Sequence, residues 1–290
     1  MNHKVIVFMA IIGSLILMGW GNPLSSSPNS HKTTSAIQQE DITKLRVFHR
    51  KLGVDNVQVQ RGIKYKTNGQ TVLTFDLYSP PSDSGLPNRP VVIFVFGYPD
   101  SAIMKMSGMK FKDWDQYISW GKLVAASSLN AIIYETTNPI EDIGDLVKYI
   151  RENADSLKIN ANSVGIWSCS GNVPVAQCYL NQEPRTSRTY LKCAVLYYGS
   201  MITADQKYQH EAESLRKQVG FILPKLENVE HLHQTVPMLV VRAGKDMPEF
   251  NQMIDHFLSE ALIKNAAITL INYAAGQHAF DIRDNTQTTR

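Results

Sequence analysis

The sequence predicts an α/β protein built on a mostly parallel central sheet with helices on both faces. Short apolar runs alternate with segments of helical spacing, and the connections between them are short. A hairpin pattern precedes this alternation, so we expect an antiparallel extension at one edge of the sheet. With 290 residues, of which 43% are hydrophobic and 19% charged, the chain is long enough to bury a sizeable core.

The N-terminal 44 residues are expected to lie outside the folded domain. Lys4 is followed by residues 5–20 without any charge, then by Gly21 and a polar tract rich in Ser. This layout is typical of a secretory signal. We therefore interpret residues 1–21 as a signal peptide, 22–44 as a linker and 45–290 as the domain. The protein is expected to be exported, periplasmic or extracellular, with an uncleaved N-terminal membrane anchor as the alternative.

The elements of the domain follow from local patterns. Residues 57–65 and 71–78 alternate in character and are joined across Asn68 and Gly69, a dipeptide that favours a tight hairpin turn because both residues tolerate positive φ. Apolar runs predict further strands at residues 91–96, 131–134, 164–167, 193–198, 237–241 and 267–273. Helical spacing predicts helices at residues 114–127, 143–150, 173–180 and 253–262.

One connection is too long for this alternation. Residues 201–235 separate two predicted strands and contain a helical piece around residues 208–219. Insertions of this length above a sheet usually act as lids or pocket walls, so we expect a lid-like segment. A solvated surface excursion is the alternative.

Charge and cysteine content narrow the class of protein. The net charge is +3, and no dense cluster of Lys and Arg appears, so nothing favours nucleic acid as a partner. Cys169, Cys178 and Cys193 lie in or beside apolar segments. We expect three buried, reduced thiols, with one disulfide plus a free thiol as the alternative.

The segment from residue 164 to residue 177, VGIWSCSGNVPVAQ, is the most informative part of the chain. A strand-like run stops at small polar residues and a helix-capable segment starts at once, as around the nucleophile of a serine hydrolase. The residues two before and two after such a nucleophile must be small, because strand and helix crowd each other there.

Three registers can be compared on this basis. With Ser170 as nucleophile the flanking positions are Ser168 and Asn172, whereas Cys169 would place a Trp, and Ser168 an Ile, two residues before the turn. Ser170 is therefore the predicted nucleophile, although Asn172 stands where Gly is usual.

A serine hydroxyl needs a base, normally a histidine oriented by a carboxylate. Asp246 follows the predicted strand at residues 237–241 through a Gly turn, and His278 follows the strand at residues 267–273. Functional groups collect at the carboxyl ends of parallel strands, so we predict Asp246 as the acid and His278 as the base. Asp255 and Asp281 are the rival acids. Compared with His278, the weaker candidates for the general base are His210, His231, His233 and His256.

An oxyanion hole is the remaining requirement. We expect one donor to be the backbone N–H of Gly171, next to the nucleophile, and the other to be the N–H of Tyr98 in the turn that follows residues 91–96. An ordinary strand-ending turn is the alternative there. Met104, Met106 and Met109 are either core filler or the lining of an acyl pocket.

These motifs together resemble the α/β-hydrolase superfamily. They are Phe96-Gly97-Tyr98, Ser168-Cys169-Ser170-Gly171-Asn172, Ala243-Gly244-Lys245-Asp246 and Gly276-Gln277-His278-Ala279-Phe280-Asp281. The last motif and the Asp246 turn most resemble the dienelactone hydrolase-like and esterase branches. The resemblance covers the chain from about residue 57 onward and implies the α/β-hydrolase fold and an esterase, lipase, thioesterase or peptidase activity that needs no cofactor.

The chain departs from that pattern in three places. Dienelactone hydrolases proper use a cysteine nucleophile, and the oxyanion turn here lacks the usual His-Gly pair. Only twelve residues follow His278 (290 − 278), so we expect a truncated C-terminal helix. Apolar surface left exposed by it would lower stability or be covered in a homo-oligomer.

The sequence thus predicts an exported serine hydrolase that cleaves a small-molecule carboxylic ester through Ser170, His278 and Asp246, without metal or cofactor. A peptidase or thioesterase on the same fold is one alternative. A non-catalytic binding protein on a hydrolase scaffold is the other.

Overall fold

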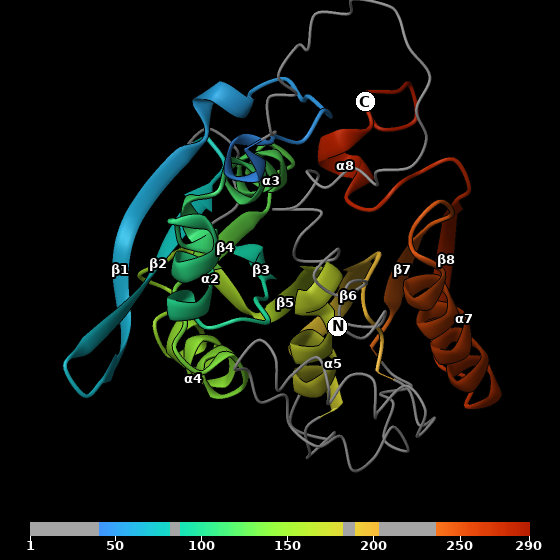
Figure 1. The fold of residues 1–290 in the computed structure, drawn as a ribbon. Helices are drawn as coiled ribbons and strands as arrows, with labels where there is room; N and C mark the ends of the chain where they lie inside the picture. Colours follow the sequence, from blue (N-terminus) through green and yellow to red (C-terminus); the bar gives the residue numbers. More distant parts are fainter. Residues whose placement is uncertain (1–40, 82–87, 182–188, 203–235) are drawn as a thin grey trace, which may run out of the picture. The chain divides into compact units, whose positions relative to one another are not determined.

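An eight-stranded sheet with the order β1-β2-β4-β3-β5-β6-β7-β8 runs through residues 45–290, which form one compact unit (Figure 1). The computed structural model describes residues 41–81, 88–181, 189–202 and 236–290. The strands are β1 (Gln58–Asn68), β2 (Thr71–Ser79), β3 (Arg89–Phe94), β4 (Asn130–Tyr134), β5 (Ile159–Cys169), β6 (Leu191–Tyr197), β7 (Met238–Ala243) and β8 (Ile268–Tyr273). The helices are α2 (Asp100–Ser107), α3 (Asp115–Ala126), α4 (Pro139–Glu152), α5 (Val173–Asn181), α7 (Pro248–Ile263) and α8 (Phe280–Arg283). Short 3₁₀ turns are η1 (Ile42–Lys44), η2 (Val54–Asn56), η3 (Phe111–Asp113) and η4 (Ser170–Asn172).

The pairing of the strands confirms the predicted fold class. β3 through β8 pair in parallel, while β1 pairs antiparallel with β2, and β2 antiparallel with β4. The hairpin therefore extends one edge of a parallel sheet, as the sequence predicts. Its turn lies one residue later than expected, since Asn68 still pairs with Thr71 and the loop is Gly69-Gln70. Gly69, with φ of 58°, supplies the positive φ that the turn requires.

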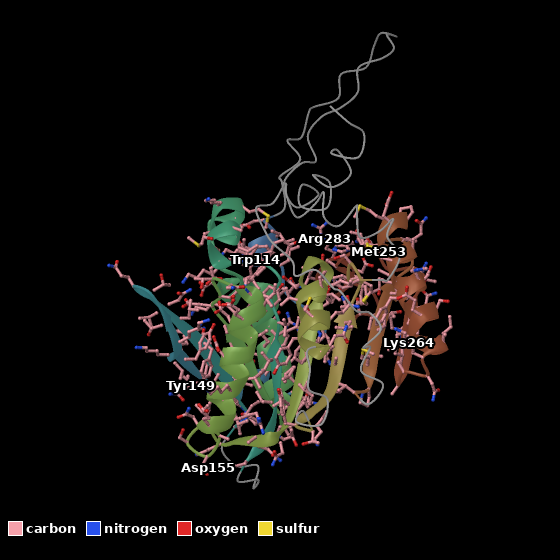
Figure 2. The ribbon with its side chains drawn as sticks, turned by 90° about the horizontal axis from the view of Figure 1, so that it is seen from below. Trp114, Tyr149, Asp155, Met253, Lys264 and Arg283 are labelled. Atoms are coloured by element: carbon pink, nitrogen blue, oxygen red, sulfur yellow. The ribbon has the colours of Figure 1, made fainter. Side chains whose placement is uncertain are left out.

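Helices cover both faces of the sheet (Figures 1 and 2). All five residues of β4 are buried, as expected of a strand packed on two sides. Phe75 of β2 contacts Tyr149 of α4 edge-on, with ring centroids 6.0 Å apart. Tyr78, three residues along the same strand, lies against Gly121 of α3. Because residues an odd number apart point to opposite faces of a strand, α4 and α3 lie on opposite sides of the sheet.

The N-terminus of α4 shows how a buried carboxylate starts a helix. Pro139 occupies the first turn, where its missing N–H is not needed. Asp142 Oδ2 accepts hydrogen bonds from Thr136 Oγ1 at 2.8 Å, Thr137 N at 2.7 Å and Asn138 N at 2.8 Å. The negative charge of Asp142 also interacts favourably with the positive, N-terminal end of the helix dipole.

The C-terminal ends of the parallel strands all lie at the same end of the sheet. Figure 2 shows Asp155, which precedes β5, at the opposite end of the sheet from Trp114 and Arg283. The segments that follow β3, β5, β7 and β8 therefore lie at the same edge, where parallel sheets place their functional groups.

Several predictions on the N-terminal region and the insertion fall outside the described residues. These are the signal peptide at residues 1–21, most of the linker and residues 203–235 of the lid-like segment. No helix within the described ranges is long and apolar enough to cross a membrane.

One helix was not expected, and the C-terminal helix is as short as predicted. The sequence did not predict α2, which begins at Asp100 directly after the predicted oxyanion turn, and in which Met104 is 43% exposed. After His278 the chain forms only the four-residue α8, and residues 284–290 contain no helix.

Candidate active site

The sharp turn between β5 and α5 is the centre of the site. β5 ends at Cys169, and Ser170 adopts a left-handed backbone conformation with φ of 54°. Such a conformation costs a non-glycine residue about 1–3 kcal/mol, so it persists only where the surroundings enforce it. The η4 turn follows at once, and α5 begins at Val173. This is the strand-to-helix turn that the sequence predicts around Ser170.

The structure brings the three predicted residues together. Ser170 Oγ lies 2.8 Å from His278 Nε2, and His278 Nδ1 lies 2.7 Å from Asp246 Oδ2. A carboxylate can only accept, so Nδ1 carries the proton of the neutral imidazole and Nε2 is free to accept from the serine hydroxyl. The arrangement therefore has the polarity that proton transfer from Ser170 to His278 requires.

Asp246 is held in place by the turn after β7. Its side chain is fully buried, and Oδ1 accepts the N–H of Met247 at 2.7 Å. The turn packs against the β8 side, where Gly244 N donates to Tyr273 O and Lys245 N donates to Gly276 O, both at 2.8 Å. A methyl group on Gly244 would lie 2.6 Å from Ala274 Cα, so only glycine allows this approach.

His278 is fixed by its neighbours while remaining accessible. The rings of Tyr198 and Phe250 flank it, with centroid distances of 5.0 Å and 5.2 Å and steep interplanar angles. Its side chain keeps 29% of its surface exposed. The imidazole can thus reach both the serine and an incoming ligand without losing its orientation.

The predicted oxyanion donors lie on two backbone segments in direct contact. A methyl group on Gly97 would stand 2.6 Å from the carbonyl oxygen of Gly171 and 2.7 Å from Asn172 Cα, so glycine is required at position 97. The phenol of Tyr98 packs directly on Gly171 Cα. The sequence did not predict this contact of the Tyr98 ring with the turn.

Asp281, one rival acid, has a different role. It is buried and accepts hydrogen bonds from Tyr198 OH at 2.5 Å, Trp120 Nε1 at 2.8 Å and Gln116 Nε2 at 3.4 Å. Burial raises the pKa of its carboxyl above the ordinary value. Asp281 thus joins α8 to α3 and to the segment after β6.

The other candidates in the described part of the chain lie at the surface of α7. Asp255 pairs with Arg242 at 2.9 Å and keeps 56% of its side chain exposed. His256 pairs with Glu260 at 3.3 Å. The remaining rival histidines, His210, His231 and His233, lie outside the described residues.

The cysteines are free thiols, and the prediction that all three are buried is wrong for one of them. Cys169 and Cys178 are buried, whereas Cys193 on β6 is exposed, as is its neighbour Lys192. Burial and the charge of Asp281 raise the pKa of the Cys169 thiol to about 12. Cys169 therefore stays protonated beside the serine and is no thiolate nucleophile. Within the described residues, no group of three His, Cys, Asp or Glu side chains is placed to hold a metal ion.

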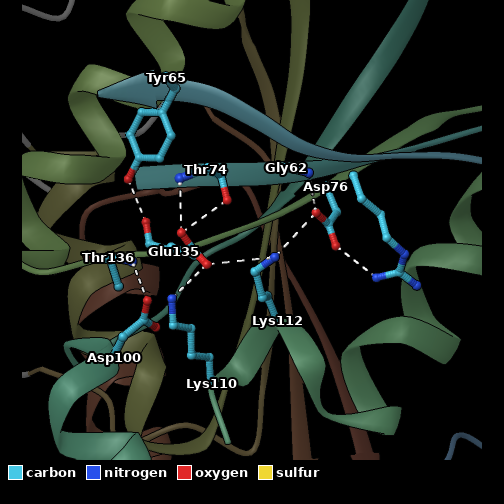
Figure 3. Close-up of polar contacts among 10 residues, drawn as sticks. Gly62, Tyr65, Thr74, Asp76, Asp100, Lys110, Lys112, Glu135 and Thr136 are labelled. Atoms are coloured by element: carbon cyan, nitrogen blue, oxygen red, sulfur yellow. Dashed lines mark hydrogen bonds and ion pairs between the residues drawn. The ribbon is translucent and has the colours of Figure 1, made fainter. Parts of the chain in front are cut away.

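A cluster of charged side chains includes Asp100, the first residue of α2 (Figure 3). Glu135 follows β4 and binds Lys110 Nζ at 2.7 Å, Thr74 Oγ1 at 3.0 Å and Thr74 N at 3.2 Å. Despite partial burial, these contacts lower the pKa of Glu135. Asp100 accepts one hydrogen bond from Thr136 N at 3.2 Å, and burial raises its pKa to about 7. The surroundings therefore lower the pKa of Glu135 and raise the pKa of Asp100.

Comparisons with known proteins agree with this architecture. Esterase 2 of Thermogutta terrifontis phosphoramylated by tabun superposes with a TM-score of 0.60 at 15% identity, over 81% of this chain and 91% of that one. The native form of that esterase gives 0.59 at 17%, over 81% and 89%. MGS-M1, an α/β hydrolase from a Medee basin deep-sea metagenome library, gives 0.55 at 17%, over 81% and 90%.

The fold and the arrangement of residues define the class of protein: the chain has the α/β-hydrolase fold. No family model matches the sequence, and no curated protein matches it either. At these identities the structural likeness establishes the fold, and it does not single out the dienelactone hydrolase-like branch.

Asp100→Asn tests the charge cluster. In the folded protein the carboxyl of Asp100 holds its proton up to a pKa of about 7, but in the unfolded chain only up to about 3.8. Between these values the native state binds more protons, so this group lowers stability as pH rises through that window. We expect Asn to have almost no effect near pH 4 and to stabilise by on the order of 1–3 kcal/mol at pH 8.

Urea unfolding of both proteins across this pH range measures the difference. The exposed Asp155, at the far end of the sheet, provides the control, because Asp155→Asn makes the same exchange at a carboxyl that is not buried. A stability difference for Asp100→Asn that is flat from pH 4 to pH 8 would contradict the assignment.

Proposed function

We propose that the protein is a serine hydrolase that cleaves carboxylic esters. The observation that carries this proposal is the hydrogen-bonded chain from Ser170 through His278 to Asp246, built on a turn in which Ser170 has a positive φ. Three side chains from distant parts of the sequence converge here with distances of 2.8 Å and 2.7 Å. A structural role does not require a strained serine with its hydroxyl on an accessible imidazole.

The reaction proceeds through an acyl-enzyme. Ser170 Oγ attacks the ester carbonyl carbon while His278 Nε2 takes the hydroxyl proton, and the buried Asp246 carboxylate stabilises the resulting imidazolium. The carbonyl electron pair moves onto oxygen, where the N–H groups of Gly171 and Tyr98 stabilise the negative charge. The C–O bond to the alcohol then breaks, and His278 returns the proton to the leaving oxygen. Water repeats the sequence on the acyl-enzyme and releases the acid.

The structural neighbours support a small ester as substrate. Esterase 2 of Thermogutta terrifontis is described with propionate bound, with butyrate bound and phosphorylated by paraoxon. The first two are short acids, and the third is an organophosphate. We therefore propose short-chain acyl esters as the first substrates to try. Peptides and thioesters are the other arms of the substrate panel.

Ser170→Ala is the primary test. Without the hydroxyl no acyl-enzyme forms, so hydrolysis of p-nitrophenyl acetate and butyrate should fall by several orders of magnitude. A fluorophosphonate probe should label the wild type at Ser170, as peptide mapping would show, and leave the variant unlabelled. Wild-type rates in a folded Ser170→Ala protein refute the assignment. A folded wild type that neither hydrolyses the panel nor accepts the probe indicates a binding protein on a hydrolase scaffold.

Asp246→Asn tests the acid. An amide at this position can donate to Nδ1 and stabilise the wrong imidazole tautomer, so we expect kcat to fall on the order of 10³–10⁴-fold. Asp255→Asn is the matched control, since that carboxylate lies on the surface of α7 beside Arg242. The control should keep the wild-type kcat. Equal rates for Asp246→Asn and Asp255→Asn would remove Asp246 from the mechanism.

We also propose that the protein is exported. The support is the charge-free run at residues 5–20 after Lys4 and the polar tract that follows it. N-terminal sequencing of the protein recovered outside the cytoplasm should begin near residue 22. Recovery of the full-length chain in the cytoplasm alone contradicts export, and recovery of the full-length chain with membranes indicates the uncleaved anchor.

A homo-oligomer stays a prediction. Its support is the group of large apolar side chains exposed at the end of α7 and on the edge strand β8. These are Leu262, Ile263, Leu270 and Ile271.

A further inference from the structure

The side chains of Ser168 and Asn172, two residues before and two residues after Ser170, both extend from the turn to a neighbouring segment. Ser168 is fully buried and Asn172 is 3% exposed. Sequence reasoning required only that these positions be small. In the structure each makes a hydrogen bond to the segment that follows β3, which carries the proposed oxyanion donor Tyr98.

The two bonds have defined directions. Ser168 Oγ donates to the carbonyl oxygen of Val95 at 3.0 Å, and Gly97 N donates to Asn172 Oδ1 at 2.7 Å. Because a backbone N–H can only donate, the amide of Asn172 must present its oxygen to Gly97. Its nitrogen then donates to Tyr117 OH at 3.0 Å. Asn172 is therefore held at both ends.

The segment after β3 needs such contacts because hydrogen bonding to the sheet extends only as far as Val95. β3 ends at Phe94, and Val95 N still donates to Trp167 O at 2.8 Å. Gly97, two residues further on, is bound to the turn through Asn172 and by the close approach of its backbone to Gly171. The peptide that carries the Tyr98 N–H is the next one along the chain. Its position therefore depends on the contact at Gly97, together with the hydrogen bond from Asp100 N to Thr136 O at 2.8 Å further along the chain.

We propose that Ser168 and Asn172 act as a clamp that positions the Tyr98 N–H relative to the Gly171 N–H and Ser170 Oγ. This rests on the proposed function. Neither side chain is assigned a contact with substrate, so both are positioning residues. An oxyanion hole works only when its donors are held within about 0.5 Å of the productive geometry, and the clamp joins the two segments that provide them.

The expected effects follow from the cost of a misplaced donor. Loss of one oxyanion donor costs about 10²–10³-fold in kcat, and a shift of 1 Å costs about 10²-fold. Asn172→Ala frees Gly97 N and should lower kcat by about 10–100-fold. Ser168→Ala frees the Val95 carbonyl, nearer the sheet, and should lower kcat by about 3–10-fold. KM for p-nitrophenyl acetate should change less than about threefold in both, because ground-state binding does not depend on the hole.

Asn153→Ala is the matched control. Asn153 Nδ2 donates to Tyr149 O at 2.8 Å at the C-terminal end of α4, on the opposite edge of the sheet. The same truncation there removes a side-chain bond to backbone without touching the site. It should lower the melting temperature and leave kcat unchanged. All variants are compared at a temperature at which their thermal melts show fully folded protein.

A second readout separates positioning from general stability. A trifluoromethyl ketone adds Ser170 Oγ to its carbonyl and forms a tetrahedral adduct with a negative oxygen in the hole. For Asn172→Ala its inhibition constant should rise by the same factor by which kcat/KM falls. A stabilising role alone would leave both values at the wild-type level in folded protein.

Each outcome decides the matter. Wild-type kcat in folded Asn172→Ala, or a change in KM alone, overturns the clamp. If Asn172→Ala does not fold, Tyr117→Phe takes its place, since it keeps the ring and removes the hydroxyl that anchors Asn172. It should lower kcat by about 2–10-fold at constant KM, and a wild-type kcat overturns the proposal. Wild-type hydrolysis by Ser170→Ala defeats the proposed function itself, a result distinct from failure of the clamp.

Discussion

The left-handed conformation of Ser170 is the constraint on which the site depends. It reverses the chain between β5, in the middle of the sheet, and α5, in which the residues from Val173 to Leu180 are buried. Burial on both sides of the turn offsets the cost of the strained residue, which is about 1–3 kcal/mol. The same reversal places the hydroxyl beyond the end of the strand, where His278 meets it.

Sheet topology then brings distant segments to that hydroxyl. β7 and β8 are parallel neighbours, so the turns that carry Asp246 and His278 leave the same edge side by side. Two glycines make these approaches close enough. Gly244 lets the turn that carries Asp246 pack on Ala274, and Gly97 lets the proposed oxyanion turn pack on the backbone of Gly171. Backbone approach, and not side-chain reach, thus sets the dimensions of the site.

Local sequence patterns were sufficient to predict most of this architecture. They were not sufficient to predict which side chains contact each other. Apolar runs located the strands, and the bulk of Trp167 and Ile166 selected Ser170 over its neighbours as the residue at the turn. α2 was missed because residues 100–107 mix Asp, Ser, Lys and Met with only Asp100 and Ile103 buried, so no apolar stripe marks the helix. The sequence ranked Asp246 above Asp281 as the acid, but it did not indicate that Asp281 is buried and accepts three hydrogen bonds. Its three donors come from α3 and the end of β6, which only the folded chain brings near.

Asn172 shows how one such contact changes the meaning of a sequence departure. Taken alone, a side chain larger than glycine at position 172 suggests a less tightly packed turn between β5 and α5. The missing His-Gly pair suggests that the proposed oxyanion turn stabilises negative charge less well. In the structure the two departures meet, because Asn172 Oδ1 accepts the N–H of Gly97 in that turn. The amide of Asn172 fits because it extends away from the turn and lies between Gly97 and Tyr117. There its oxygen and its nitrogen are both hydrogen-bonded. A glycine at position 172 would leave the buried Gly97 N–H without this acceptor, at a cost of about 1–3 kcal/mol for an unsatisfied group. The turn between β5 and α5 and the proposed oxyanion turn are therefore interdependent, and a change in one is expected to require a compensating change in the other.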